Sequence, residues 1–182
     1  MITLNSLIKF LYSNPSCHKP QNNNYSYLNE LSQDLAISLF NKNSKCIDTW
    51  EKVGTFKLPY FEMGVINSTH LFGLDELIIF SYYIHNASNY KRAMDIGANI
   101  GLHSLILSRL GIETTSFEPD PIHIKELNSN LKKNNVSKKV EVKAFAMSNK
   151  KNKLEFCRVK GNTTGSHLVG SKKNPYGDLD FF

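Results

Sequence analysis

The stretch MDIGANIGLHS, residues 94–104, constrains the fold of this 182-residue chain more than any other segment. A short apolar lead-in reaches an acid, two glycines enclose an asparagine, and an apolar run with helical spacing follows. Glycine is needed where the backbone takes a positive φ or passes close beneath another group, and a helix N-terminus offers free N–H groups. The pattern predicts a tight turn from a strand into a helix, with Asp95, Gly97, Asn99 and Gly101 at the turn.

Strands and helices alternate around this turn. Gly111 is a normal stop signal for the helix after the turn, and Pro121 stands in the first turn of the next helix. The predicted strands are 92–97, 112–120, 139–148 and 153–159, and the predicted helices are 101–111 and 121–135. Strands separated by helices of this length form right-handed crossovers and a parallel sheet. Ligands of such sheets bind at the carboxyl ends of the strands, which is where the glycine turn lies.

The chain before this alternation is organised differently. The sequence predicts a polar connector at 14–24, a helix at 27–42, a hairpin within 54–67 and a buried helix at 72–88. We therefore divide the chain into an N-terminal helical and hairpin region, residues 1–70, and a second region, residues 71–182.

The turn departs from the fingerprint of dinucleotide-binding proteins. That fingerprint is G-x-G-x-x-G, and its second glycine lets a pyrophosphate approach the backbone. Here Asn99 replaces the second glycine and Leu102 stands where the third would be. Asp95 adds a negative charge that suits a cationic amino group better than a phosphate. An acid followed by this glycine and asparagine spacing is typical of a site for S-adenosylmethionine (SAM).

Glu118 supports the same interpretation. It ends the second predicted strand 23 residues after Asp95, close to the roughly 20-residue spacing at which an acid meets the ribose of a nucleotide. A carboxylate at this place can accept hydrogen bonds from both the 2′ and the 3′ hydroxyl. The alternative is a solvated acid before a proline-bounded loop, and the pairing with the glycine turn favours the ribose role.

Four segments of the chain resemble, in order and spacing, the FkbM-type family of SAM-dependent methyltransferases. They are MDIGANIGLHS, SFEPDP, ELNSNLKKNN and AFAMSNKKNKLEF, and the similarity covers roughly residues 71–170. The resemblance implies an α/β, Rossmann-like class I methyltransferase sheet, here preceded by a mainly helical N-terminal region. It also implies SAM as the cofactor and methyl transfer to an oxygen of a sugar or glycan-linked small molecule.

The resemblance assigns residues of this chain to the cofactor. By position, the methionine end would be lined by the residues of the glycine turn, Asp95, Gly97, Ala98, Asn99 and Gly101. Glu118 would hold the ribose, Pro119 and Asp120 would shape the adenine side, and Ala146 and Met147 would flank the adenine ring. Ser148 would form a hydrogen bond nearby. The catalytic base is not assigned.

One segment of the family pattern is missing. The family continues with a strand carrying an acidic K-I-D-x-E-G-like segment on the acceptor side, and none follows here. We therefore expect a fragment that ends before the C-terminal half of the sheet, with the strand at 92–97 an exposed edge open to self-association. Two other functions stay open. One is a SAM-binding fragment without turnover, and the other is an NAD-dependent oxidoreductase, which the missing middle glycine disfavours.

Charge and composition limit the classes of partner and the cellular compartment that we expect for this protein. The first 90 residues carry a balance of −1 and the rest +7, but no aromatic residues are interleaved with the basic runs as a nucleic-acid track requires. No apolar run is long enough for a membrane helix, and the histidines form no metal-spaced pair. Cys17, Cys46 and Cys157 are odd in number and widely spaced, which suits a reduced cytoplasmic protein. We expect no nucleic acid, no membrane span and no metal.

Overall fold

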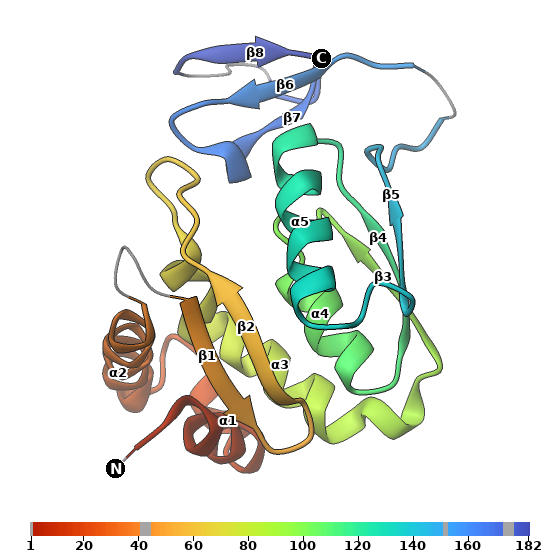
Figure 1. The fold of residues 1–182 in the computed structure, drawn as a ribbon. Helices are drawn as coiled ribbons and strands as arrows, with labels where there is room; N and C mark the ends of the chain where they lie inside the picture. The colour runs from red at the N-terminus through yellow and green to blue at the C-terminus, as the bar shows by residue number, and fades with distance from the viewer. Residues whose placement is uncertain (1, 41–44, 151–152, 173–176) are drawn as a thin grey trace.

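Five α-helices and three small sheets make up the computed structural model, which describes residues 2–40, 45–150, 153–172 and 177–182 (Figure 1). The α-helices are α1 (Leu4–Ser13), α2 (Asn23–Leu39), α3 (Leu74–Asn86), α4 (Leu102–Arg109) and α5 (Pro121–Lys133). The strands are β1 (Lys45–Trp50), β2 (Gly54–Pro59), β3 (Arg92–Ile96), β4 (Glu113–Phe117), β5 (Val140–Lys143), β6 (Phe156–Val159), β7 (His167–Leu168) and β8 (Leu179–Phe181). Short 3-10 helices occupy Pro15–His18, Ser68–Phe72, Ala87–Asn89 and Thr163–Gly165. The predicted mixed α/β class is confirmed.

An aromatic core joins the N-terminal elements. The indole ring of Trp50 in β1 packs edge-on against Phe56 of β2, with 4.9 Å between the ring centroids. Phe72 and Phe80 lie 6.1 and 5.5 Å from the same indole ring. All four side chains are fully buried, and each contributes roughly 1.5–3 kcal/mol by leaving water. The predicted buried helix at 72–88, observed as α3, thus packs into the core of the elements that precede it.

The hairpin is shifted from its predicted place. β1 and β2 pair antiparallel from Lys45 with Pro59 to Trp50 with Gly54, so residues 54–59 form the second arm rather than the first. The prediction of a hairpin within 54–67 was therefore wrong about the partner strand. The sequence of β1 mixes charged and apolar residues without clear alternation, so it gave no signal for a strand. The strand is defined by its pairing with β2.

The helix predicted at 27–42 begins earlier than expected. α2 starts at Asn23, because the side chain of Asn22 accepts a hydrogen bond from the Asn24 N–H at 2.9 Å and caps the helix. It ends at Leu39, because Phe40 is already extended, and residues 41 and 42 of the predicted helix lie outside the described residues. A 3-10 helix also interrupts the segment that was predicted as a polar connector.

The central sheet is parallel, with the order β3-β4-β5, and corresponds to the first three predicted strands of the second region. α4 and α5 cover one face of it (Figure 1). Asp95 faces this side, whereas Met94 and Ile96 alternate to the other side and are 71% and 61% exposed. Within the described ranges, β3 is an edge strand with apolar side chains on an uncovered face.

The predicted strand at 153–159 does not belong to the parallel sheet. β6 pairs antiparallel with β7 and β8 in a separate three-stranded sheet, which lies near the end of α5 (Figure 1). A parallel partner needs a crossover of about a dozen or more residues, usually a helix, whereas antiparallel strands can be joined by a short turn. Residues 144–150 and 153–155 contain no helix, and residues 160–166, with one short 3-10 helix, lead from β6 back to β7, so the two strands pair antiparallel.

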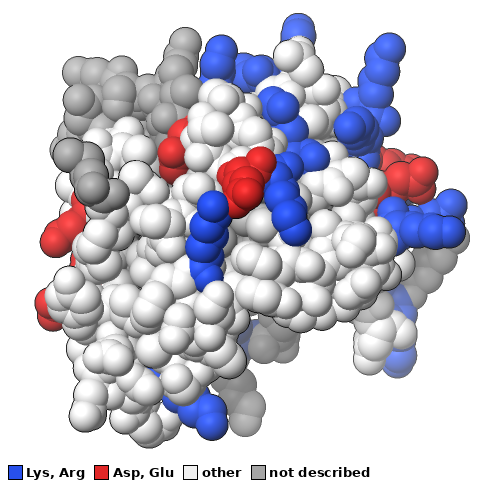
Figure 2. Space-filling view, turned by 90° about the horizontal axis from the view of Figure 1, so that it is seen from below, with Lys and Arg blue, Asp and Glu red and all other residues white. Residues whose placement is uncertain are grey.

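Basic side chains are interspersed with acidic ones on the surface. Figure 2 shows lysines and arginines on the face seen from below, with acidic groups between them. Exposed ion pairs join Lys9 to Glu51, Arg92 to Glu113, Lys143 to Glu141 and Lys160 to Asp180. Such pairs contribute little to stability. In the part of the chain that the structure describes, no helix has both the length and the apolar character needed to span a membrane.

Candidate functional site

The glycine turn joins β3 to α4 through three residues with positive φ. Gly97, Asn99 and Gly101 have φ values of 77°, 49° and 85°. Glycine and asparagine tolerate this region better than other residues do. At Gly101 a Cβ would also lie 2.9 Å from the Leu127 Cγ of α5. Gly101 is therefore required both by the backbone conformation and by the close packing of the turn on α5.

Four of the five backbone N–H groups of the turn, residues 97–101, donate hydrogen bonds within the protein. Gly97 and Ala98 donate to one carbonyl at the end of β4, at 2.9 and 3.1 Å, and Gly101 donates back into the turn at 2.8 Å. The N–H of Asn99 donates to Glu118 Oε2 at 2.8 Å. A pyrophosphate would need free N–H groups at this place. These four N–H groups are therefore not available to a phosphate.

Glu118 lies directly after β4 and is fixed on both carboxylate oxygens. Besides the bond to the turn, its Oε1 accepts from the N–H of Asp120 at 2.9 Å, and the residue is only 5% exposed. Burial raises the pKa of Glu118; the two N–H bonds oppose this rise, and the charges of Asp120 and Asp95 add to it. A carboxylate has about four acceptor positions. The two N–H bonds therefore leave about two acceptor positions of Glu118 unused.

A pocket of about 440 Å³ opens beside the turn and collects most of the residues that the sequence assigned to the cofactor. Six of them line it, namely Gly97, Asn99, Glu118, Pro119, Ala146 and Met147. Its other wall comes from the C-terminal segment and α5, including His123, Thr163, Thr164, Ser166 and His167. Residues far apart in the sequence thus meet at the carboxyl ends of β3 and β4.

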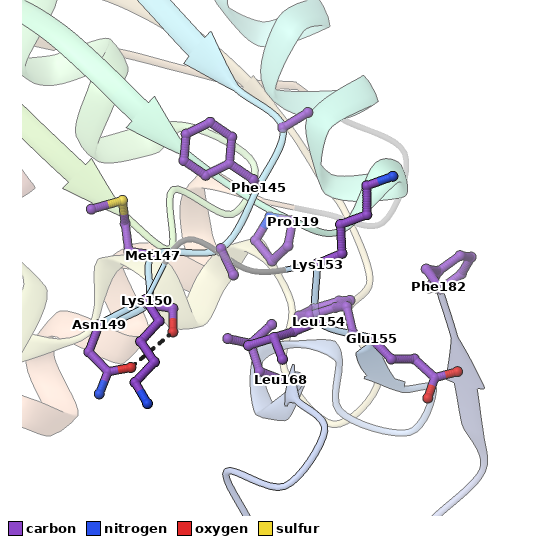
Figure 3. Close-up of a pocket in the computed structure, with 14 residues that line it drawn as sticks. Pro119, Phe145, Met147, Asn149, Lys150, Lys153, Leu154, Glu155, Leu168 and Phe182 are labelled. Atoms are coloured by element: carbon purple, nitrogen blue, oxygen red, sulfur yellow. Dashed lines mark hydrogen bonds between the residues drawn. The ribbon is translucent and has the colours of Figure 1, made fainter.

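A larger pocket of about 990 Å³ adjoins the first one (Figure 3). The two share Pro119, Ala146, Met147, Phe156 and Leu168. Figure 3 shows the side chains of Phe145, Leu154 and Leu168 around this space, with Lys150 and Lys153 also contributing to its lining. Ser148 lines it as well, and its hydroxyl donates to Asn149 at 3.5 Å. The shared wall is apolar, as a purine ring prefers.

The remaining four assigned residues lie behind the pocket rather than in its lining. Asp95 points towards α4, where the Ser104 hydroxyl donates to its carboxylate at 2.5 Å. Ala98 is buried, Gly101 packs on α5, and Asp120 is the N-cap of α5. Asp95 can therefore act on the pocket only through its charge. The other three residues support the backbone that surrounds the pocket.

A buried polar network beside Glu118 was not predicted from the sequence. Arg158 of β6 donates from Nε to Asp120 Oδ2 at 2.6 Å, and their side chains are 13% and 1% exposed. His123 Nε2 lies 2.9 Å from Thr163 Oγ1. Burial lowers the pKa of His123, Arg158 adds to this effect, and Asp120 opposes it, so the ring is neutral at pH 7. The network ties the β6–β8 sheet to the pocket, and its partners stand 38 and 40 residues apart, beyond any local sequence pattern.

Comparison of the chain with protein-family models, with curated proteins and with solved structures finds no match. Among the described residues, no three His, Cys, Asp or Glu side chains are grouped so as to hold a metal ion.

Proposed function

We propose that this protein is a SAM-dependent methyltransferase of the Rossmann-like class I fold, acting on an oxygen of a sugar or glycan-linked small molecule. The observation that carries the proposal is the 2.8 Å hydrogen bond between the Asn99 N–H and Glu118, which holds a strand-end acid in the pocket that the glycine turn borders. A ribose bound there would donate both hydroxyls to this acid. The fixed carboxylate needs no reorganisation to accept them.

The size and layout of the two pockets support SAM as the cofactor. Volumes of about 440 and 990 Å³ lie in the range of roughly 300–1,000 Å³ that small-molecule sites occupy. With the ribose on Glu118, the adenine would reach the apolar wall formed by Pro119, Ala146 and Met147. The methionine end would lie at Gly97, where the missing side chain leaves room.

The charge around the turn favours a cationic cofactor. Asp95 and Asp120 both lie close enough to Glu118 for their charges to raise its pKa further, after the larger effect of burial. Arg158 pairs with Asp120, which leaves the charges of Asp95 and Glu118 to act on the pocket. Opposite charges attract and like charges repel. A sulfonium group is stabilised here, whereas the pyrophosphate of NAD is repelled, and this disfavours the oxidoreductase alternative.

The residues of this protein would mainly bind the cofactor and align its methyl group with the acceptor oxygen. SAM, when bound, would supply a methyl group activated by the positive sulfur. Glu118 would fix the ribose, and the turn would set the position of the methionine end relative to it. The backbone N–H of Asp120 donates to Glu118, and the ion pair between Asp120 and Arg158 holds this part of the backbone in place. Alignment of this kind accounts for much of the rate of a group transfer.

Titration calorimetry tests the proposal directly. We expect S-adenosylhomocysteine, the demethylated product, to bind to the protein, and NAD to give no heat above dilution. Binding of NAD without binding of S-adenosylhomocysteine would contradict the proposal. Transfer of a labelled methyl group from SAM to a panel of sugars and glycosides then separates a methyltransferase from a SAM-binding protein without turnover.

A further inference from the structure

Three titratable side chains form a hydrogen-bonded chain that neither pocket uses. Glu76 and Tyr83 come from α3, and His103 comes from the first turn of α4. His103 Nε2 lies 2.8 Å from Glu76 Oε2, and His103 Nδ1 lies 3.2 Å from the Tyr83 hydroxyl oxygen. The order of the chain is therefore acid, imidazole, hydroxyl.

The hydrogens of this chain have a definite direction. The Glu76 carboxylate only accepts, so the hydrogen of the neutral imidazole is on Nε2. Nδ1 is then left to accept the hydrogen of the Tyr83 hydroxyl. In this arrangement an imidazole can take a proton from a hydroxyl while a carboxylate orients the ring and stabilises its charge.

The surroundings make His103 a stronger base than an ordinary histidine. Burial alone would lower the pKa of His103, but the hydrogen bond to Glu76, its charge and the charge of Asp95 outweigh burial and raise the pKa. The ring is held against Phe80, with 4.9 Å between the centroids. Burial, followed by the charges of Asp95 and Glu76, raises the pKa of Tyr83. Tyr83 therefore keeps its hydrogen at neutral pH and can act only by passing it on.

The chain of side chains adjoins the glycine turn. His103 stands two residues after Gly101, and the next residue, Ser104, holds the carboxylate of Asp95 at 2.5 Å. The side chains of His103 and Glu76 are 29% and 34% exposed and Tyr83 is half-buried, so none of the three is sealed from solvent. The charge of Asp95 contributes to the raised pKa of both His103 and Tyr83.

We propose that Tyr83, His103 and Glu76 form the proton-accepting group for a hydroxyl-bearing acceptor, with Tyr83 in contact with that hydroxyl. The acceptor proton moves to the Tyr83 oxygen as the Tyr83 hydrogen moves to His103 Nδ1, and Glu76 stabilises the resulting imidazolium. The acceptor oxygen keeps the electron pair of its O–H bond and forms the bond to the methyl carbon, while sulfur keeps the pair of the broken S–C bond. Tyr83 is the catalytic residue, and His103 and Glu76 are positioning residues. The inference rests on the proposed function for the identity of the reaction.

The reactivity of the Tyr83 oxygen can be measured without an acceptor or cofactor. An arylsulfonyl fluoride forms a sulfonate ester with a tyrosine oxygen and releases fluoride and a proton, and a neighbouring base accelerates the step. We expect benzenesulfonyl fluoride to label Tyr83 at least about tenfold faster than the exposed Tyr27, with a rate that rises as His103 loses its proton. Peptide mass spectrometry across a pH series gives both rates. Labelling of Tyr83 no faster than that of Tyr27 would overturn the proposal.

Two variants separate a proton relay from a structural contact. Glu76→Gln keeps the shape but removes the charge that raises the pKa of His103, so the rise in labelling should move to lower pH. His103→Gln should abolish the excess labelling of Tyr83. If His103→Gln does not fold, the shift in Glu76→Gln decides alone, and an unchanged pH profile in Glu76→Gln contradicts the relay.

A final comparison keeps this inference distinct from the proposed function. Tyr83→Phe should leave the affinity for S-adenosylhomocysteine unchanged and reduce methyl transfer to methyl glucoside, as a probe alcohol, at least about tenfold. If S-adenosylhomocysteine does not bind to the wild-type protein, the proposed function fails while the labelling result stands. If it binds but Tyr83 reacts like Tyr27, the proposed function stands and the relay fails.

Discussion

Replacing Glu118 with glutamine tests the ribose role most directly. The carboxylate is held by two backbone N–H groups at 2.8 and 2.9 Å and is 5% exposed, so its place is set before a ligand arrives. Glutamine keeps one acceptor oxygen and turns an amide towards the position of the second hydroxyl. The loss is about one hydrogen bond to a charged group, about 1.5–3 kcal/mol, which weakens S-adenosylhomocysteine binding roughly 10- to 150-fold.

Calorimetry with S-adenosylhomocysteine and its 2′-deoxy analogue, on the wild type and Glu118→Gln, forms a double-mutant cycle. If Glu118 contacts the ribose, loss of the 2′ hydroxyl should weaken binding less in Glu118→Gln than in the wild type. Glu113→Gln is the control, because Glu113 is an exposed acid at the opposite end of the same strand. Its affinity should equal that of the wild type.

Two results would refute the ribose role. An unchanged affinity in Glu118→Gln removes the residue from the binding site. If the losses in affinity from the two changes are additive, the substitution acts by disturbing the glycine turn and not the ribose contact. The N–H groups of Asn99 and Asp120 also donate to this carboxylate, so the turn depends on it.

Three further predictions concern pH, packing and the buried ion pair. Affinity for S-adenosylhomocysteine should fall as the pH falls through the pKa of Glu118, which is raised mainly by burial. The protonated carboxyl group that forms is a poorer acceptor for the ribose hydroxyls. Calorimetry over a pH series should show this fall in the wild type and not in Glu118→Gln. Gly101→Ala should lower the free energy of unfolding in urea by about 1–3 kcal/mol, because φ is 85° and the new Cβ would lie 2.9 Å from a leucine side chain. Arg158→Met should lower it by about 3–5 kcal/mol, because Asp120 would remain as an unpaired buried charge.

Matched variants make these expectations specific. Gly111→Ala has a similar φ, 89°, but open space around the new Cβ, so it should be milder than Gly101→Ala. Equal losses would mean that the packing of the turn on α5 contributes nothing. Lys160→Met breaks an exposed ion pair and should change the unfolding free energy little. An equally small effect of Arg158→Met would contradict the dependence of Asp120 on its partner. An affinity that does not vary with pH in the wild type would contradict the titration of Glu118.

The elements around the glycine turn could be predicted because their signals are local. Glycines with positive φ mark the turn, Gly111 and Pro121 delimit the helices, and the strand between them ends at Phe117, directly before Glu118. The partner of a strand is not a local property. β6 was correctly expected as a strand but placed in the wrong sheet, because the choice between parallel and antiparallel pairing depends on the connection before and after it.

The polar networks could not be predicted for a related reason. The bonds of Glu76 to His103 and of Asp120 to Arg158 join residues 27 and 38 positions apart. A single charged side chain has no period, so its sequence context does not distinguish a solvated residue from a buried partner. Only the folded chain shows that Asp95 accepts a hydrogen bond from Ser104 of α4.

Trp50 gives the protein a built-in optical reporter of the N-terminal core. It is the single tryptophan of the chain, it is fully buried among phenylalanine rings, and its indole N–H donates to Asp48 at 2.8 Å. An indole shielded from water emits at shorter wavelength than one in water, so loss of this core shifts the emission to the red. Trp50 does not line either pocket beside the glycine turn. Tryptophan fluorescence should therefore follow unfolding of every variant while staying silent when a ligand binds.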